Sequence, residues 1–187
     1  MKRRWNQTGF TLLELMTVVA IIGILTAIAI PNFMNAAIRA KVAKAEADIE
    51  NLVWSLEMYF VDFDEYPTNQ QTGKSLRGDL SRLTTPIPYM NFVPRDVFLS
   101  PNKYERKEYI QAERDGNPNY RFINFLSTDG NRVSLKQFGL EGSANYAMYS
   151  FGPGFSADCD PMIPNTFIKY NPSNGTTSHG AVLSFGP

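Results

Sequence analysis

The sequence of 187 residues predicts an α+β protein in which a long N-terminal α-helix packs on a small antiparallel β-sheet. Three observations lead to this fold class. Residues 10–30 form an apolar run, residues 38–59 repeat apolar side chains at helical spacing, and residues 119–151 contain short aromatic and β-branched segments. The expected regions are a leader at 1–9, a transmembrane helical part at 10–30, an amphipathic helical part at 31–62 and a globular head at 63–187.

The run from Phe10 to Ile30 is long enough to cross a membrane, because about 20 apolar residues in a helix cover the hydrocarbon core. Its only charged residue is Glu14. Three basic residues at positions 2–4 precede it, and no other basic residue occurs before Arg39. The positive-inside rule therefore predicts a single-pass membrane protein whose N-terminus is cytoplasmic and whose residues after Ile30 lie on the far side of the membrane.

Other kinds of apolar N-terminal segment explain this run less well. A cleaved secretory signal has a shorter apolar region followed by a small-residue cleavage site. A lipoprotein signal needs a cysteine directly after the run, but the one cysteine of the chain is Cys159. A plain membrane anchor stays open, although it leaves Glu14 unexplained, because a carboxylate inside hydrocarbon is costly and usually marks a function.

The basic leader ending in Gly9, followed by Phe10 and then TLLELMTVVAIIGILTAIAIPNF, resembles the N-terminus of type IV pilins and type II secretion pseudopilins. This resemblance implies a pilin-like fold and cleavage by a prepilin peptidase between Gly9 and Phe10, with methylation of the new amine of Phe10. It also implies that Glu14 meets the charged N-terminus of a neighbouring subunit during filament assembly. The pairing is physically reasonable, because a buried ammonium and a buried carboxylate are each costly alone.

The second half of the helix is predicted from one apolar stripe with spacings of three and four. The stripe consists of Ile38, Val42, Ala45, Ile49, Leu52, Leu56 and Tyr59. Between these positions, Lys41, Lys44, Asp48, Asn51, Ser55 and Glu57 are expected to face water.

An unbroken helix is expected from Phe10 to about Asp62, with weak points at Gly23 and Pro31. Both match positions where the helix of the resembling family bends or unwinds in filaments. We therefore expect a kink or a melted turn between Gly23 and Pro31 in a filament, more than in an isolated subunit.

Repeated proline and glycine residues rule out another long helix after Asp62, although Ser75 to Leu83 is expected to form a short one. The stretch from Leu83 to Phe98 resembles the connecting loop of major pseudopilins. Pro94, Arg95 and Asp96 match its pattern, whereas Val97 replaces the usual proline.

Three strands are expected at Asn119 to Leu126, Arg132 to Phe138 and Asn145 to Phe151. The Asp-Gly pair within Ser127 to Asn131 is a turn signal that joins the first two as a hairpin. The resulting sheet is expected to lie against the second half of the long helix.

Two later stretches, NYAMYSFGP (Asn145 to Pro153) and YNPSNGTTSHG (Tyr170 to Gly180), resemble the C-terminal signatures of G-type pseudopilins. Relatives with calcium hold the ion in a loop after the S-x-G-P element. Here Gly154 replaces the aspartate often found there, which leaves Asp158 and Asp160 as the acidic candidates for a structural calcium site. Acidic residues in such loops also serve simply as turn formers, and no cofactor is required.

Catalysis and nucleic-acid binding are not expected. The chain balances 18 Lys and Arg against 18 Asp and Glu, so it offers no strongly basic domain for a phosphate backbone. It contains no Gly-rich phosphate loop, nucleophile elbow or HExxH motif. Cys159 and the one histidine, His179, are 20 positions apart and suggest no catalytic pair.

The leading interpretation is a structural pseudopilin that polymerises into a helical periplasmic filament for type II protein secretion. The resemblance implies as partners copies of itself, a prepilin peptidase, an assembly platform with its ATPase, minor pseudopilins and the inner membrane. A type IV pilin forming a surface fibre for adhesion, motility or DNA uptake is the first alternative. A membrane-anchored periplasmic protein of another function is the second.

Overall fold

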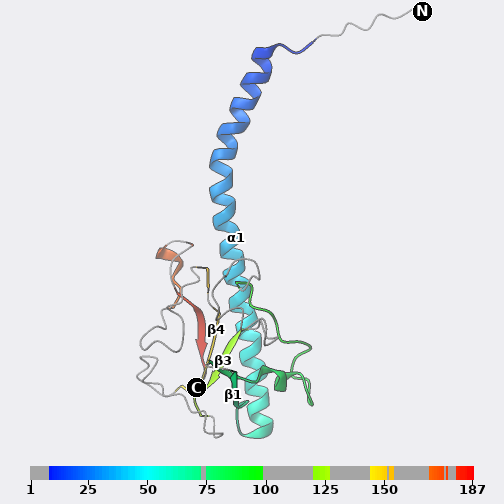
Figure 1. The fold of residues 1–187 in the computed structure, drawn as a ribbon, viewed down its shortest axis with the longest axis vertical. Helices are drawn as coiled ribbons and strands as arrows, with labels where there is room; N and C mark the ends of the chain where they lie inside the picture. The colour runs from blue at the N-terminus through cyan, green and yellow to red at the C-terminus, as the bar shows by residue number, and fades with distance from the viewer. Residues whose placement is uncertain are drawn as a thin grey trace, which may run out of the picture. The chain divides into compact units, whose positions relative to one another are not determined.

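The computed structural model describes residues 9–72, 75–98, 120–126, 144–150, 152–153, 169–174, 176 and 180–187. The chain divides into two compact units, Met1–Ala37 and Ile38–Pro187, and helix α1 (Leu12–Phe63) contributes to both. The other elements are β1 (Asn69–Thr72), β2 (Ser75–Gly78), η1 (Leu80–Leu83), β3 (Arg121–Asn124), β4 (Tyr146–Ser150), η4 (Pro172–Asn174) and β5 (Val182–Phe185). This arrangement confirms the α+β fold class (Figure 1).

Helix α1 is continuous over 52 residues and includes Pro31. Its bounds lie close to the predicted Phe10 and Asp62. The helix stops at Asp64, which adopts the left-handed conformation with φ of 55° and donates its backbone N–H to the carbonyl of Phe60 at 2.8 Å. A left-handed residue directly after the last turn is a common helix terminator, because its N–H satisfies one of the last carbonyls.

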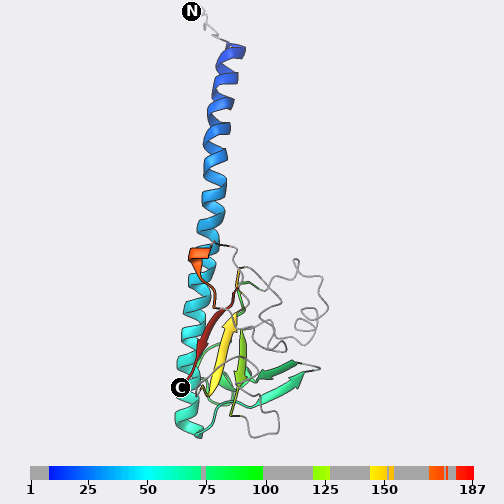
Figure 2. The same ribbon diagram turned by 90° about the vertical axis from the view of Figure 1, so that its left-hand side faces the viewer.

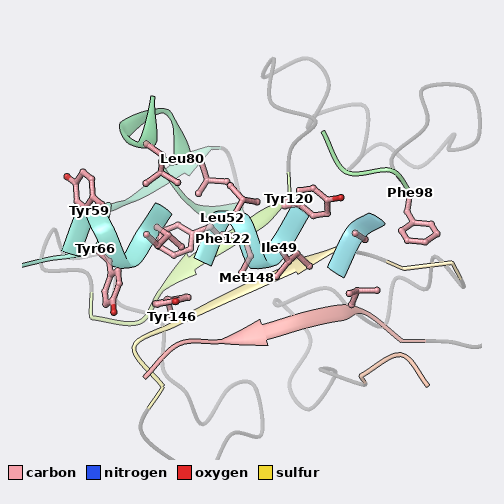
Figure 3. Close-up of a cluster of buried hydrophobic side chains, with 14 of the residues drawn as sticks. Ile49, Leu52, Tyr59, Tyr66, Leu80, Phe98, Tyr120, Phe122, Tyr146 and Met148 are labelled. Atoms are coloured by element: carbon pink, nitrogen blue, oxygen red, sulfur yellow. The ribbon is translucent and has the colours of Figure 1, made fainter. Parts of the chain in front are cut away.

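The amphipathic half of α1 buries the predicted apolar stripe against the head, where it forms the main core with aromatic side chains from the sheet (Figure 3). Six of the seven predicted positions are buried, and Ile38 is half-buried. The expectation that Ser55, Asp48 and Glu57 face water is wrong. Ser55 is buried with its hydroxyl bonded to the Asn51 carbonyl at 2.9 Å, whereas Asp48 and Glu57 are half-buried and accept hydrogen bonds from tyrosines.

A three-stranded antiparallel sheet in the order β3-β4-β5 lies along this half of α1 (Figures 1 and 2). Side chains alternate between its faces, so Phe122 and Met148 join the main core while Ile123 and Ala147 join a second cluster. The strands predicted around Asn119–Leu126 and Asn145–Phe151 are confirmed as β3 and β4. The segment 132–138 and the turn 127–131 lie outside the described residues, and β5 was not predicted.

The short helix expected from Ser75 to Leu83 is wrong in its first half. Ser75 to Gly78 form β2, which pairs with β1 in an antiparallel hairpin, and only Leu80–Leu83 are helical, as the 3-10 turn η1. Asp79 caps this turn through a hydrogen bond from the Ser81 N–H at 3.1 Å. Only Gly73 and Lys74 separate β1 from β2, and a two-residue link that begins with glycine is a hairpin signal that the sequence reading missed.

Candidate functional site

The candidate processing site precedes α1. Gly9, Phe10 and Thr11 lie before the first helical residue, and all three are exposed. A Cβ atom added to Gly9 would meet nothing within 4 Å. The described part of the chain therefore places no steric demand on Gly9 and leaves the bond between Gly9 and Phe10 open to an enzyme.

Thr11 and Glu14 form a reciprocal capping box at the start of α1. The Glu14 Oε2 atom accepts hydrogen bonds from the Thr11 backbone N–H at 2.9 Å and from the Thr11 hydroxyl at 2.7 Å. In return, the Glu14 N–H donates to Thr11 Oγ1 at 3.2 Å. Threonine at the N-cap with glutamate three residues later satisfies backbone donors that have no partner inside the helix. Glu14 is thus already held in place within one subunit.

Helix α1 contains a stretch that is apolar enough and long enough to cross a membrane, and none of that stretch is buried. Its polar side chains are matched locally: Thr17 donates to the Glu14 carbonyl at 2.9 Å, and Thr26 donates to the Ile22 carbonyl at 2.7 Å. Such bonds let threonine sit in lipid without an unpaired hydroxyl. Glu14 is therefore the one charge that hydrocarbon would surround.

Gly23 and Pro31 lie in the helical part of α1 that the sequence singles out as weak. A Cβ atom added to Gly23 would meet nothing within 4 Å, so glycine at this position is not required by packing inside the subunit. Pro31 has no N–H to give to the carbonyl of Ala27, so the helix lacks one hydrogen bond there. The expected kink or melted turn concerns a filament and stays a prediction.

In the head, hydrogen bonds attach the end of β4 to the connecting loop, residues 83–98. The Ser150 hydroxyl at the end of β4 donates to Asp96 Oδ1 at 2.7 Å, and the Phe98 backbone N–H donates to the same oxygen at 2.9 Å. Asp96 is 2% exposed. The sequence identified Asp96 only as a motif match, and the structure shows that its carboxylate fixes the connecting loop to β4.

Two glycines of the predicted signatures allow a close backbone approach. Gly152 has φ of 71°, and a Cβ atom there would lie 2.3 Å from the Gly180 carbonyl oxygen. Gly180 has φ of 139°, and its Cβ atom would lie 2.7 Å from the Tyr170 Cα atom. Both conformations and both contacts exclude a side chain. Glycine at these two positions therefore allows the backbone at residues 152, 170 and 180 to approach closely.

Two carboxylates on the buried side of α1 accept hydrogen bonds from tyrosines of the head. Glu57 accepts from Tyr146 at 2.7 Å and from Tyr66 at 3.3 Å, and Asp48 accepts from Tyr120 at 2.8 Å. Burial and the neighbouring Glu57 carboxylate raise the pKa of Tyr66 to about 12. Burial and hydrogen bonding to the carboxylates likewise raise the pKa of Tyr146 and of Tyr120. The sequence reading missed these pairs, because the tyrosines that contact α1 are distant in the sequence.

The calcium candidates Asp158 and Asp160 lie outside the described residues, as do Cys159 and His179. Among the residues that the structure describes, no group of three or more His, Cys, Asp or Glu side chains could hold a metal ion.

Comparison with known families gives two matches that divide the chain where its helix changes character. The family "Prokaryotic N-terminal methylation motif" matches residues 6–30. The family "Type II secretion system (T2SS), protein G" matches residues 32–115. The first match includes Gly9, Phe10 and Glu14, and the second includes the amphipathic half of α1 and Asp96. No solved structure matches the chain significantly.

Several relatives named type II secretion system core protein G are similar to this chain. The protein from Dickeya chrysanthemi is 31% identical over 182 residues, which cover 96% of this chain and 95% of that relative. The Escherichia coli (strain K12) protein is 43% identical over 59% of this chain and 84% of its own length, and the Vibrio cholerae protein is 37% identical over 56% and 74%. The chain therefore belongs to the type II secretion system core protein G family, a family of structural pseudopilins with an N-terminal methylation motif and not of enzymes.

Proposed function

We propose that this chain is inserted into the inner membrane, cleaved between Gly9 and Phe10, methylated at the new amine of Phe10, and polymerised into a periplasmic filament. The observation that carries the proposal is the position of Glu14. It is the only charge in the span 10–30, and it is held at the very start of the helix, next to the end that cleavage creates.

The hydrogen bonds of Glu14 support a pairing with a neighbouring subunit. Its Oε2 atom is occupied by Thr11, whereas Oε1 has no hydrogen-bond partner within the described residues. A carboxylate in hydrocarbon is stabilised by a positive group. The amine of Phe10 on the next subunit supplies such a group, and one pair between each two subunits would set their axial offset.

The leader supports the topology. Its three basic residues, at positions 2–4, orient the chain with the N-terminus in the cytoplasm. Their removal leaves 15 basic side chains, which is 18 minus 3, against 18 acidic ones. Because the sequence has no nucleotide-binding motif, the work of assembly would come from a separate ATPase acting through a membrane platform, with minor pseudopilins as further partners.

Pro31 is proposed as the point where α1 opens during assembly. The carbonyl of Ala27 already lacks its helical donor there, so unwinding the adjacent turn breaks fewer hydrogen bonds than elsewhere. Replacing Pro31 by alanine is expected to stiffen the helix and to slow filament growth, which can be followed by electron microscopy of assembled filaments. Filaments of normal length and yield from this variant would remove the role of Pro31.

Three substitutions separate the charge of Glu14 from its capping role. Glutamine still accepts from Thr11, so Glu14→Gln keeps the capping box and loses the charge, whereas Glu14→Ala loses both. Thr11→Ala weakens the cap and keeps the charge. We expect both Glu14 variants to be cleaved normally but to assemble poorly, and Thr11→Ala to assemble nearly as well as the original chain.

The readouts are mass spectrometry of the mature N-terminus and the filament yield in sheared or fractionated cells. A peptide that begins with methylated Phe10 supports the processing step, while a retained leader contradicts it. Normal filaments from Glu14→Gln would show that charge pairing is not needed. Long fibres of this subunit on the cell surface would favour a type IV pilin instead.

A structural calcium ion stays a prediction for the loop that contains Asp158 and Asp160. Two carboxylates need several carbonyl oxygens to complete the six to eight ligands of this ion. If the ion binds, a chelator should lower the unfolding temperature of the mature protein, and added calcium should restore it. An unfolding temperature that is the same with and without chelator would remove the calcium site.

A further inference from the structure

A groove runs between α1 and the edge strand β5 within the second unit. It has a volume of about 230 Å³ and is lined on the helix side by Glu46, Ile49, Glu50 and Val53. The sheet side is formed by residues 181–184, and Lys169 and Tyr170 close one end. Figure 2 shows β5 as the strand of the sheet that ends the order β3-β4-β5.

The ladder between β4 and β5 determines which backbone groups face this groove. The Gly186 N–H donates to the Tyr146 carbonyl at 3.1 Å, which makes these two residues a hydrogen-bonded pair of the antiparallel ladder. Since such pairs alternate along the ladder, Ser184 and Val182 also bond to β4. The N–H and C=O groups of Leu183 therefore point away from β4, and within the described residues they have no partner.

The same edge already accepts another stretch of chain at one point. Lys169 forms a parallel bridge with Ala181, and the Tyr170 N–H donates to the Ala181 carbonyl at 2.8 Å. This pairing ends there because Pro172 begins the turn η4. The outward groups of Leu183 thus continue a line of strand pairing that the described residues do not complete.

The helix wall of the groove is negatively charged. Glu46 and Glu50 are exposed and lie one turn apart on α1, and the described part of the chain gives neither of them an ion-pair partner. Lys169 contributes one positive charge at the end of the groove. Ile49 and Val53 also line the helix side; Ile49 is 3% exposed, so the half-buried Val53 provides most of the open apolar surface there.

We propose that this groove binds an extended segment of another polypeptide that carries basic side chains, as a fourth strand beside β5. The backbone of that segment would pair with Leu183, its apolar side chains would cover Val53, and its basic side chains would face Glu46 and Glu50. Strand addition to an open sheet edge gives affinity through main-chain hydrogen bonds and specificity through alternate side chains. The groove shares no residue with the span 10–30, so the proposal does not rest on the pairing proposed for Glu14.

The test uses the mature full-length chain in detergent micelles and three synthetic heptapeptides with blocked ends. The first alternates lysine and valine, the second replaces every lysine by glutamate, and the third carries proline at its centre. Binding is measured by isothermal titration calorimetry, and amide hydrogen exchange of Leu183 is followed by NMR. We expect the lysine peptide to bind about tenfold more tightly than the glutamate peptide and to slow exchange at Leu183, whereas the proline peptide gives no such protection.

Matched variants test the charge contribution. The double variant Glu46→Gln with Glu50→Gln should weaken binding of the lysine peptide by about fivefold, since each exposed ion pair contributes modestly. The control Glu65→Gln removes an exposed carboxylate outside the groove and should change binding less than about twofold.

Three results would overturn the proposal. The first is absence of binding by the lysine peptide. The second is binding that leaves exchange at Leu183 unchanged, which would indicate attachment to the charged surface only. The third is protection of Leu183 on self-association of the chain without peptide, which would show that a second copy occupies the groove.

Discussion

Replacing Asp96 by alanine tests the contact that fixes the connecting loop to β4. The Asp96 carboxylate is 2% exposed and accepts hydrogen bonds from the Ser150 hydroxyl at 2.7 Å and from the Phe98 N–H at 2.9 Å. Alanine would leave both donors buried without this acceptor. Each unsatisfied buried donor costs about 1–3 kcal/mol, so we expect the free energy of unfolding to fall by about 3 kcal/mol.

The assay is thermal and urea unfolding of the chain in detergent, followed by near-UV circular dichroism of the tyrosine-rich core. For a chain of this size, a loss of about 3 kcal/mol corresponds to a decrease of about 6–12 °C in the unfolding temperature. Asp96→Asn keeps one acceptor oxygen and should lose less stability than Asp96→Ala. Glu65→Ala, an exposed carboxylate change, is the control and should stay within about 0.5 kcal/mol of the original chain.

A double-mutant cycle with Ser150→Ala isolates the pair. If the contact is as important as its burial indicates, the effects of Asp96→Ala and Ser150→Ala should differ from additivity by more than about 0.5 kcal/mol. Additive effects, or an Asp96→Ala variant as stable as the Glu65→Ala control, would refute the role assigned to Asp96.

Three further outcomes are expected. Asp64→Gly should raise the free energy of unfolding by about 0.5–1 kcal/mol, because glycine adopts the left-handed conformation of this helix stop without steric cost; urea unfolding measures the gain. Leu52→Ala should lower it by about 2–5 kcal/mol, because Leu52 is fully buried in the main core; the same urea unfolding checks the loss. The pKa of Tyr66 is raised to about 12 in the folded protein, so its contribution to the free energy of unfolding should be complete below pH 10 and lost between pH 10 and 12, where ionisation favours the unfolded chain. Ultraviolet difference spectra and circular dichroism over this pH range test the sign, and Tyr66→Phe should reduce the slope of the free energy of unfolding against pH.

Helix α1 could be predicted closely from the sequence, because both of its signals are local. The apolar run and the stripe at spacings of three and four require no knowledge of the rest of the chain. Ser55 shows the limit of such a pattern. Its hydroxyl donates a hydrogen bond to the Asn51 carbonyl, so this polar residue can be buried beside the stripe. The exact end of the helix could not be predicted for a related reason. Asp64 ends the helix by adopting the left-handed conformation, but aspartate is not the residue type that usually marks such an end.

Strands β1, β2 and β5 could not be predicted in the same way, because none of them belongs to a longer segment of aromatic and β-branched residues. The equally short β3 could be predicted because it lies inside such a segment, residues 119–126. Their positions depend on partners elsewhere, as when β5 pairs with β4 and β1 pairs with β2. The tyrosine partners of Glu57 and Asp48 were missed for the same reason.

The C-terminal signature was useful for recognising the family, and its residues turn out to have structural roles. The Asn145 carbonyl accepts from Phe125 at 2.8 Å, the Tyr146 hydroxyl bonds to Glu57, and Ser150 bonds to Asp96. Gly152 cannot carry a side chain at its position. These four residues of the motif maintain the packing of sheet, loop and helix. The motif therefore identifies the architecture of the head. The charge proposed to pair with a neighbouring subunit lies outside this motif, because Glu14 is the only charged residue in the span 10–30.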